Sequence, residues 1–389
     1  MQSPRIAIAA VLCVGLAVGT GGCGGHSRVP RTRAGTLSIY TSLPFNGPYA
    51  NDARSIYDAE QLALSQAGDT VNGFHVRLRL LNDASSGTGQ TDPTTITVNA
   101  RIAASDPSTI AYIGELSPGS SPYAIPVLSS AGILQVSPGD TATGVSGTTF
   151  ARVVPRDSLQ ALAQLAVMRK QDVKRLFIVK DRSTYGADIT AATVRNAASY
   201  GIDVVDPRGR YLGSSTESLV RAIGRSNAGA LLYAGGPGAG VTTLWNALST
   251  VEGTIRKFGS ADITNAASWS QTTLAARENT YLSAPGLARQ ELPRAGSQFV
   301  ADFQSRYGTR VSWANGIFGY VAMSGVLDAL YGLGPPARNQ RERLLSSFLG
   351  TRALPSALGS YDIIGGQTTF DGYFFTKYDG FGRAESYSP

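Results

Sequence analysis

A turn at residues 112 to 121, with the sequence YIGELSPGSS, is the first place where this chain could do chemistry. An apolar stretch leads there into Ser117, Gly119, Ser120 and Ser121. Such a turn between a strand and a helix can cradle a phosphate, expose a nucleophilic serine or bind a carboxylate, because the N–H groups of a helix start favour anions. It can also be an ordinary serine cap at a corner of the chain. The residue types leave all four interpretations open.

Three further turns carry side chains that could contact a ligand. SPGDTATG offers Gly139 for a tight turn and a hydroxyl at Thr141, DRSTYGAD places Tyr185 at the opening of a helix, and GSADITNA contains Asp262, whose carboxylate could face a cation. Each feature also has a plain structural interpretation, as a surface loop, a packed tyrosine or a solvated carboxylate.

The residues that enzymes commonly use are scarce. After the first 35 residues the sequence has one histidine, His75, and no Cys/His spacing that would hold a metal. It lacks a G-x-S-x-G elbow, and SSGTGQT at 85–91 resembles a phosphate loop without the required lysine. We therefore expect a protein that is not an enzyme and that uses no metal or cofactor.

The elements that must position these turns alternate between strand and helix. Short β-rich runs are TLSIYTSL, HVRLRLLND, TIAYIG, GILQVS, RLFIVKD, GALLYAGG and IRKFGS. Helical spacing follows near 50–68, 93–104, 119–131, 158–171, 185–200, 215–226 and 239–250. This order predicts an α/β fold with parallel sheets covered by helices on both faces.

The pattern implies two such sheets. The first series ends where TTFARVVPRD meets Pro155, and late helices after residue 284 need a sheet on which to pack. We expect one lobe at 36–153 and 284–370, and a second at 154–283 and 371–389. Ligands in open α/β sheets bind beyond the carboxyl ends of the strands, where the turns named above would lie.

The first residues predict export. Arg5 precedes the apolar run IAIAAVLCVGLAV, which is shorter than the roughly 20 residues of a membrane-spanning helix. GTGGC then resembles a bacterial lipobox, although Thr20 stands where leucine is usual. We predict a signal peptide at 1–22, lipidation of Cys23 and a flexible tether at 23–35; ordinary secretion with cleavage elsewhere is the alternative. Cys13 would leave with the signal, so no disulfide is expected.

Composition sets broader bounds. The chain has 389 residues, of which 42% are hydrophobic and 16% are charged, as in ordinary globular proteins. Its formal charge of +7 becomes +6 once Arg5 is removed with the signal. The basic residues are scattered and lack interleaved aromatic residues, so we do not expect a nucleic-acid partner.

Five ordered segments resemble one family. NGPYANDARSIYDAEQLALSQAG, YIGELSPGSS, LQVSPGDTATG, FARVVPRD and VKDRSTYGAD are similar to the branched-chain amino-acid-binding (Leu/Ile/Val-binding) type of periplasmic binding protein, the type 1 substrate-binding proteins of ABC transporters. The resemblance extends over about residues 36–280 and more loosely to the end. It implies two doubly wound lobes joined by three crossovers, a ligand cleft between the lobes and closure that signals a membrane permease.

The resemblance also implies site residues. The turns at Ser117 to Ser121 and Gly139 to Thr141 would bind the α-carboxylate of an amino acid, and Asp262 would pair with its ammonium group. Tyr185 would line the cleft, and Trp313 would wall the side-chain pocket. Three positions depart from the family. Pro118 replaces a hydroxyl residue, so the carboxylate contact is expected to shift to Ser120 and Ser121. Pro237 replaces a tyrosine, and Asp262 replaces the longer glutamate.

The sequence therefore predicts a monomeric, lipid-anchored solute-binding protein on the extracytoplasmic face of the membrane. It would pass an amino acid or similar zwitterion to the permease of an ABC importer. A ligand-binding sensor with the same fold and no transport role is the alternative.

Overall fold

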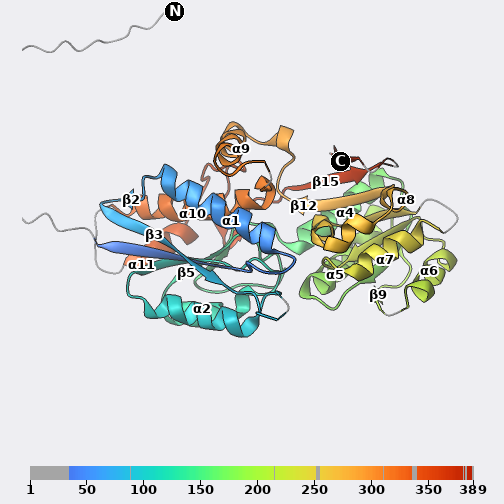
Figure 1. Ribbon diagram of the computed structural model, residues 1–389, viewed down its shortest axis with the longest axis horizontal. Helices are drawn as coiled ribbons and strands as arrows, with labels where there is room; N and C mark the ends of the chain where they lie inside the picture. Colours follow the sequence, from blue (N-terminus) through green and yellow to red (C-terminus); the bar gives the residue numbers. More distant parts are fainter. Residues whose placement is uncertain are drawn as a thin grey trace, which may run out of the picture. The chain divides into compact units, whose positions relative to one another are not determined.

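The computed structural model describes residues 35–87, 89–213, 215–250, 255–309, 311–334, 340–379, 381 and 383–387. The predicted signal peptide, the lipidation site Cys23 and the tether apart from Gly35 lie outside this described part. The described strands form two sheets, each with its own helices (Figure 1). No helix within the described ranges is long and apolar enough to cross a membrane.

The first sheet has the strand order β13-β14-β6-β5-β4-β1-β3-β2. Its strands are β1 (Thr36–Leu43), β2 (Thr70–Val71), β3 (Phe74–Asn82), β4 (Thr109–Ile113), β5 (Leu134–Ser137), β6 (Phe150–Arg152), β13 (Ile363–Ile364) and β14 (Gln367–Thr368). Pairing is parallel from β3 through β1, β4, β5 and β6 to β14.

Helices cover both faces of this sheet. They are α1 (Ala50–Gln66), α2 (Pro93–Ser105), α3 (Ile125–Ser130), α9 (Arg294–Tyr307), α10 (Trp313–Gly332) and α11 (Gln340–Leu349). Ile39 of β1 packs in the core formed with α1, α9, α10 and α11, whereas its neighbour Tyr40 packs with α2 and α3. Figure 1 shows α1 and α10 on one side of the sheet and α2 on the other. Successive strand residues therefore bury opposite faces.

The second sheet has the order β16-β15-β12-β11-β10-β7-β8, with β9 paired to β7. Its strands are β7 (Arg175–Lys180), β8 (Asp203–Val204), β9 (Arg210–Tyr211), β10 (Ala230–Ala234), β11 (Arg256–Ser260), β12 (Thr280–Pro285), β15 (Tyr373–Tyr378) and β16 (Ala384–Tyr387). Strands β7, β10, β11 and β12 are parallel.

The helices of this lobe are α4 (Asp157–Lys170), α5 (Thr184–Asn196), α6 (Thr216–Arg225), α7 (Ala239–Leu248) and α8 (Leu274–Arg277). Leu232 of β10 packs in the core with α4 and α5, and Leu231 packs with α6 and α7. The predicted α/β fold, with parallel sheets covered on both faces, is confirmed in both lobes.

Local sequence signals explain several element ends. Gly68 has φ of +76° just after α1 ends at Gln66, close to the end of the helix predicted near 50–68. The Asp92 side chain caps α2 by accepting a hydrogen bond of 2.9 Å from the Thr95 N–H, with Pro93 at the first helical position. Ser183 caps α5 in the same way through the Gly186 N–H.

The sheet edges differ from the predicted parallel pattern. Strands β2, β13, β15 and β16 pair antiparallel with a neighbour. Asn72 and Gly73 join β2 to β3 with φ of +51° and +82°, the positive angles of a two-residue hairpin. Short connections of this kind can join only antiparallel strands, because a parallel return needs a longer crossover.

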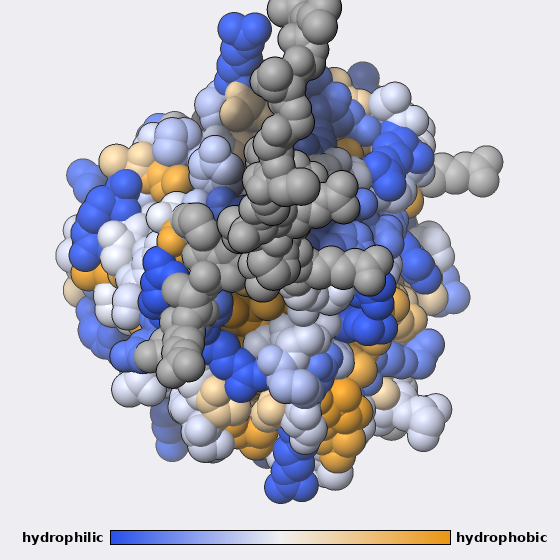
Figure 2. Space-filling model, turned by 90° about the vertical axis from the view of Figure 1, so that its left-hand side faces the viewer, coloured by the Kyte–Doolittle hydropathy of each residue, from blue (hydrophilic) through white to orange (hydrophobic). Residues whose placement is uncertain are grey.

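The described chain passes between the lobes after β6, after β12 and after β14. Helix α10 packs against α1, so segments about 260 residues apart in the sequence share one core. The end of the molecule seen in Figure 2 is largely hydrophilic, and its hydrophobic residues lie in separate patches.

Candidate functional site

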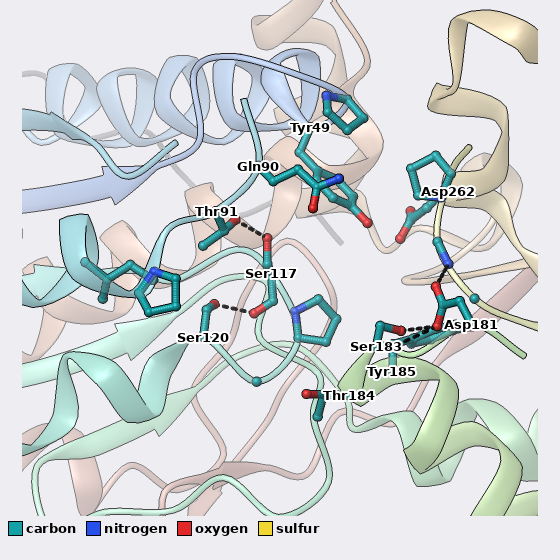
Figure 3. A pocket seen from close by; sticks show the side chains of 18 of the residues that line it. Tyr49, Gln90, Thr91, Ser117, Ser120, Asp181, Ser183, Thr184, Tyr185 and Asp262 are labelled. Atoms are coloured by element: carbon teal, nitrogen blue, oxygen red, sulfur yellow. Dashed lines mark hydrogen bonds between the residues drawn. The ribbon is translucent and has the colours of Figure 1, made fainter. Parts of the chain in front are cut away.

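A cavity of about 330 Å³ lies between the two lobes. The first lobe contributes Tyr49, Thr91, Ser117, Gly119 and Ser120, and the second contributes Asp181, Thr184, Tyr185, Gly236 and Asp262 (Figure 3). A smaller cavity of about 60 Å³ adjoins it and shares Tyr49, Pro118, Tyr185 and Asp262. The larger volume is within the range of small-molecule sites.

The cavity lies where parallel strands end. Tyr49 follows β1, Ser117 follows β4, Asp181 follows β7, Gly236 follows β10 and Asp262 follows β11. These turns face one another because the carboxyl ends of the parallel strands in each sheet point to the same edge. The site is therefore built almost entirely from turns, held in place by the two sheets.

The backbone N–H groups of Gly119, Ser120 and Ser121 in the turn at 117–121 all donate within the protein. The backbone N–H groups of Gly119 and Ser121 donate to the two carboxylate oxygens of Asp140, at 2.7 and 2.8 Å. The Ser120 N–H and hydroxyl both donate to the Ser117 carbonyl. The hydroxyls of Ser117 and Thr91 are hydrogen-bonded at 2.5 Å. Figure 3 marks this bond with a dashed line. The carboxylate-binding geometry expected here exists, but a side chain of the protein fills it.

Asp140 is held firmly in this position. Its side chain has no solvent exposure, its N–H donates to Ser137 Oγ at 2.8 Å, and its Oδ1 also accepts from the Ala142 N–H at 3.1 Å. The buried Arg152 guanidinium donates to the carbonyls of Asp140 and Ala142 at 2.6 and 2.8 Å. The Arg152 side chain thus holds the loop that carries Asp140 in place.

The opposite wall is acidic. The Asp181 carboxylate accepts hydrogen bonds of 2.9 Å from the N–H groups of Ser183 and Gly236, and so ties together the turns after β7 and β10. Burial, followed by the negative charge of Asp52, raises the pKa of Asp262 to about 7, against a hydrogen bond from Ser260. Figure 3 shows the Tyr49 hydroxyl and the Asp262 carboxylate pointing toward one another.

Asp52 brings a further carboxylate to the smaller cavity from α1. It accepts a hydrogen bond of 2.7 Å from the Asn265 side chain of the other lobe. Burial raises the pKa of Asp52, and hydrogen bonds from Asn315 and Asn265 oppose that rise. Among the described residues that line the two cavities, none is lysine, arginine or histidine. The cleft therefore favours a positively charged group.

The structure brings most of the predicted site residues together. Ser117, Gly119 and Ser120 line the larger cavity, Gly139 and Thr141 line the smaller one, and Tyr185 and Asp262 line both. The binding roles of these residues remain predictions.

Two of the predicted site residues, Ser121 and Trp313, line neither cavity. Ser121 is fully buried behind the turn and lines neither cavity, because its N–H points to Asp140. Trp313 opens α10 and packs against the core of the first lobe, and it lines neither cavity; its predicted role in the side-chain pocket stays a prediction. The expected shift of the carboxylate contact to Ser120 and Ser121 stays a prediction, and the backbone N–H groups of both residues already donate within the protein.

Sequence inspection missed residues that shape the cleft. Tyr49 lines both cavities, and burial together with the charges of Asp262, Asp52 and Asp181 raises its pKa far above the ordinary value. Asp140 lies in the motif SPGDTATG, between the predicted site residues Gly139 and Thr141. The sequence signal for Asp140 is its place in a turn, where a carboxylate commonly accepts hydrogen bonds from free N–H groups.

Known proteins resemble this chain both in sequence pattern and in fold. Residues 39–379 match the family model described as periplasmic binding protein. The leucine-binding protein LivK of Thermotoga maritima has a TM-score of 0.76 at 18% identity, covering 91% of this chain and 98% of that chain. LivJ of Streptococcus pneumoniae, in complex with isoleucine, has a TM-score of 0.74 at 16% identity, covering 91% and 100%.

A solute-binding protein of R. palustris in complex with 4-hydroxybenzoate is similar to the same degree, with a TM-score of 0.76 at 13% identity over 91% of this chain and 96% of that chain. A search of curated proteins returned no match. The neighbours confirm the two-lobed fold predicted from the motifs, while their ligands differ from one another. The family match extends over most of the chain, which therefore belongs to the periplasmic binding protein family.

Proposed function

We propose that this protein is the extracytoplasmic solute receptor of an ABC importer and binds a small molecule with a protonated amine, such as an amino acid or a related solute. The observation that carries this proposal is the acidic cleft between the lobes. Asp262, Asp181 and Asp52 line it, and no basic side chain is found among its described lining residues. A buried carboxylate is stabilised best by a cationic partner.

Ligand binding would act by closing the lobes. A solute that contacts Tyr49 on the first lobe and Asp262 on the second binds the closed state more tightly than the open one. It shifts the equilibrium toward closure by that difference in affinity. The closed form would then be the one that the permease recognises. The binding proteins of leucine, isoleucine and 4-hydroxybenzoate share this fold, so the ligand class has to be inferred from the side chains of this cleft.

A lipid anchor at Cys23 would hold the receptor at the membrane near its permease. Labelling of cells with a radioactive fatty acid tests this part of the proposal. The full chain is expected to carry label and a Cys23→Ala variant to carry none. Equal labelling of both would disprove the anchor without touching the ligand proposal.

Thermal unfolding of the full chain with a panel of amino acids, alkylamines and simple carboxylic acids tests the ligand class. A ligand at 100 times its dissociation constant stabilises the folded state by about 2.7 kcal/mol, which is readily seen as a rise in Tm. We expect stabilisation by members that carry an amine and none by carboxylic acids alone. Stabilisation only by carboxylic acids such as benzoates would overturn the proposal.

A variant links the effect to the site. Asp262→Ala is expected to weaken binding of the stabilising amine at least about tenfold, because a buried cation would lose its charged partner. Glu217→Ala, on the exposed face of α6, is the charge-matched control and should bind as the parent does. Uptake of the identified amine by cells that lack the gene should fall, as the import role requires.

A further inference from the structure

We infer that the carboxylate of Asp140 occupies the position that a ligand carboxylate would take at the turn 117–121. The ligand is therefore an organic amine without a free carboxylate. The inference rests on the proposed function, since it narrows the amine-bearing solutes proposed above to one class.

The first support is the state of the N–H groups in the turn. Pro118 has none, Gly119 and Ser121 donate to Asp140 at 2.7 and 2.8 Å, and Ser120 donates to the Ser117 carbonyl at 3.1 Å. Every backbone position from 118 to 121 is thus unable to donate to a ligand. A carboxylate arriving here would find no free backbone N–H group from 118 to 121 and would meet the Asp140 carboxylate in the position where those groups converge.

The second support is that Asp140 cannot easily leave. The residue has no solvent exposure, its Oδ1 atom also accepts from Ala142, and the loop that carries it is held by three hydrogen bonds from Arg152. Moving its carboxylate aside would bury an unpaired charge and would leave the N–H groups of Gly119, Ser121 and Ala142 without their acceptor. A ligand carboxylate would have to compensate for both losses.

The third support is the charge of the cavity. A zwitterion would bring its carboxylate into a space lined by Asp181 and Asp262, with Asp52 in the adjoining cavity. The aromatic side chains of Tyr49, Tyr123 and Tyr185 line the same space and can contact an organic cation or its hydrocarbon part. A molecule with an amine and an uncharged remainder matches both features.

Matched probes separate the two classes of ligand. Isothermal titration of the full chain would compare leucine, leucinamide, 3-methylbutylamine and 4-methylpentanoate, which share one branched hydrocarbon. Phenylalanine, phenylalaninamide, phenethylamine and 3-phenylpropanoate form a second series with an aromatic group. We expect the amide or the amine to bind at least tenfold more tightly than the amino acid in at least one series, and the carboxylates not to bind.

The outcomes distinguish this inference from the proposed function. An amino acid that binds tenfold more tightly than its amide would overturn the inference and leave the proposed function intact. Absence of binding by every amine and amino acid of both series would contradict the proposed function, and the inference would fall with it.

Substitution of Asp140 gives a second, independent measurement. Asp140→Ala frees the N–H groups of Gly119 and Ser121, so the ratio of leucine to leucinamide affinity should shift toward leucine by at least tenfold. If this variant does not fold, Asp140→Asn removes the charge but keeps the shape, and a shift of at least threefold is expected. Asp203→Asn, at an exposed ion pair with Arg175, is the control and should leave the ratio unchanged. An unchanged ratio in a folded Asp140 variant would overturn the inference.

Discussion

The side-chain amide of Asn265 donates a hydrogen bond of 2.7 Å to the carboxylate of Asp52, and this bond joins the second lobe to the first beside the smaller cavity. A second bond of the same kind connects the Thr143 N–H of the first lobe to the Asp188 carboxylate on α5, at 2.7 Å. Both bonds run directly from one lobe to the other. They should therefore influence how readily the cleft closes on a ligand.

Replacement of Asn265 by alanine should favour the open cleft. Loss of one hydrogen bond to a carboxylate costs about 1.5 kcal/mol, or roughly tenfold in the closing equilibrium. We expect weaker binding of the stabilising amine by about that factor, and a larger radius of gyration in small-angle X-ray scattering of the unliganded protein.

Asn246→Ala is the matched control for Asn265→Ala. The Asn246 side chain bonds only within the second lobe, to Gln271 and Thr273, so its loss should lower stability without changing the affinity. Equal effects of the two variants on affinity would show that the bond to Asp52 has no part in closure.

Glycine at position 119 should be required for the lobes to approach. Its φ is +79°, and an added Cβ would lie 2.9 Å from Thr184 Oγ1 across the cleft. Gly119→Ala is expected to lower stability by about 1 kcal/mol through the left-handed backbone and, in addition, to weaken ligand binding by obstructing closure. Thermal unfolding and isothermal titration measure the two effects separately.

Gly132→Ala provides the comparison for Gly119→Ala. Gly132 has a similar φ of +63°, but an added Cβ there meets no atom within 4 Å. This variant should show the loss of stability alone. A loss of affinity as large as that of Gly119→Ala would mean that backbone strain, and not contact with Thr184, explains the effect.

Affinity for an amine should depend on pH through Asp262. Its pKa of about 7 means that the carboxylate becomes neutral as the pH falls below 7, while an alkylamine stays protonated across the range from 5 to 8.5. Binding of 3-methylbutylamine should therefore weaken toward acid, by at most about tenfold per pH unit. The other titratable groups that interact with Asp262 are Asp52, Tyr49, Tyr185 and Tyr373.

Asp262→Asn isolates this contribution. The variant should bind more weakly at pH 8 and should lose most of the acid-side decline, as measured by titration calorimetry at several pH values. A decline as steep as in the parent protein would assign the dependence to another group.

Stability should fall with rising pH because of Asp157. Burial is the main cause that raises the pKa of this carboxyl, in the first turn of α4, from 3.8 to about 8. Between about pH 4 and 8, Asp157 therefore keeps its proton in the folded protein but has lost it in the unfolded chain. The resulting stabilisation is complete below about pH 4 and is lost as the pH rises through 8.

Asp157→Asn keeps this position neutral at every pH. Its free energy of unfolding, from denaturant titrations between pH 5 and 9, should fall less steeply than that of the parent. The variant should also be the more stable of the two at pH 9. Parallel pH profiles for the two proteins would show that Asp157 does not carry the proton.

Much of the fold could be predicted from the sequence because its signals are local. The alternation of apolar runs with helical spacing determined the order of strands and helices, and Gly68 marked the end of α1. The same logic placed Ser117, Tyr185 and Asp262 after strands, so that their meeting in one cleft follows from the parallel arrangement of the strands. The packing of Trp313 against the core could not be predicted, because a long helix has several faces and the sequence does not say which face meets the core.

The occupant of the carboxylate position was decided only by the tertiary structure. The serine and glycine residues of YIGELSPGSS determined that a turn with available N–H groups would form at this edge of the sheet. Which acceptor those groups meet depends on the distance between the turns after β4 and β5, and there the Asp140 carboxylate lies within 2.8 Å of Gly119 and Ser121. Likewise, Asp52 and Asn265 meet across 213 residues of sequence because the two lobes are folded against each other. Local periodicity specifies elements, whereas the pairing of charges across a cleft depends on how those elements are packed.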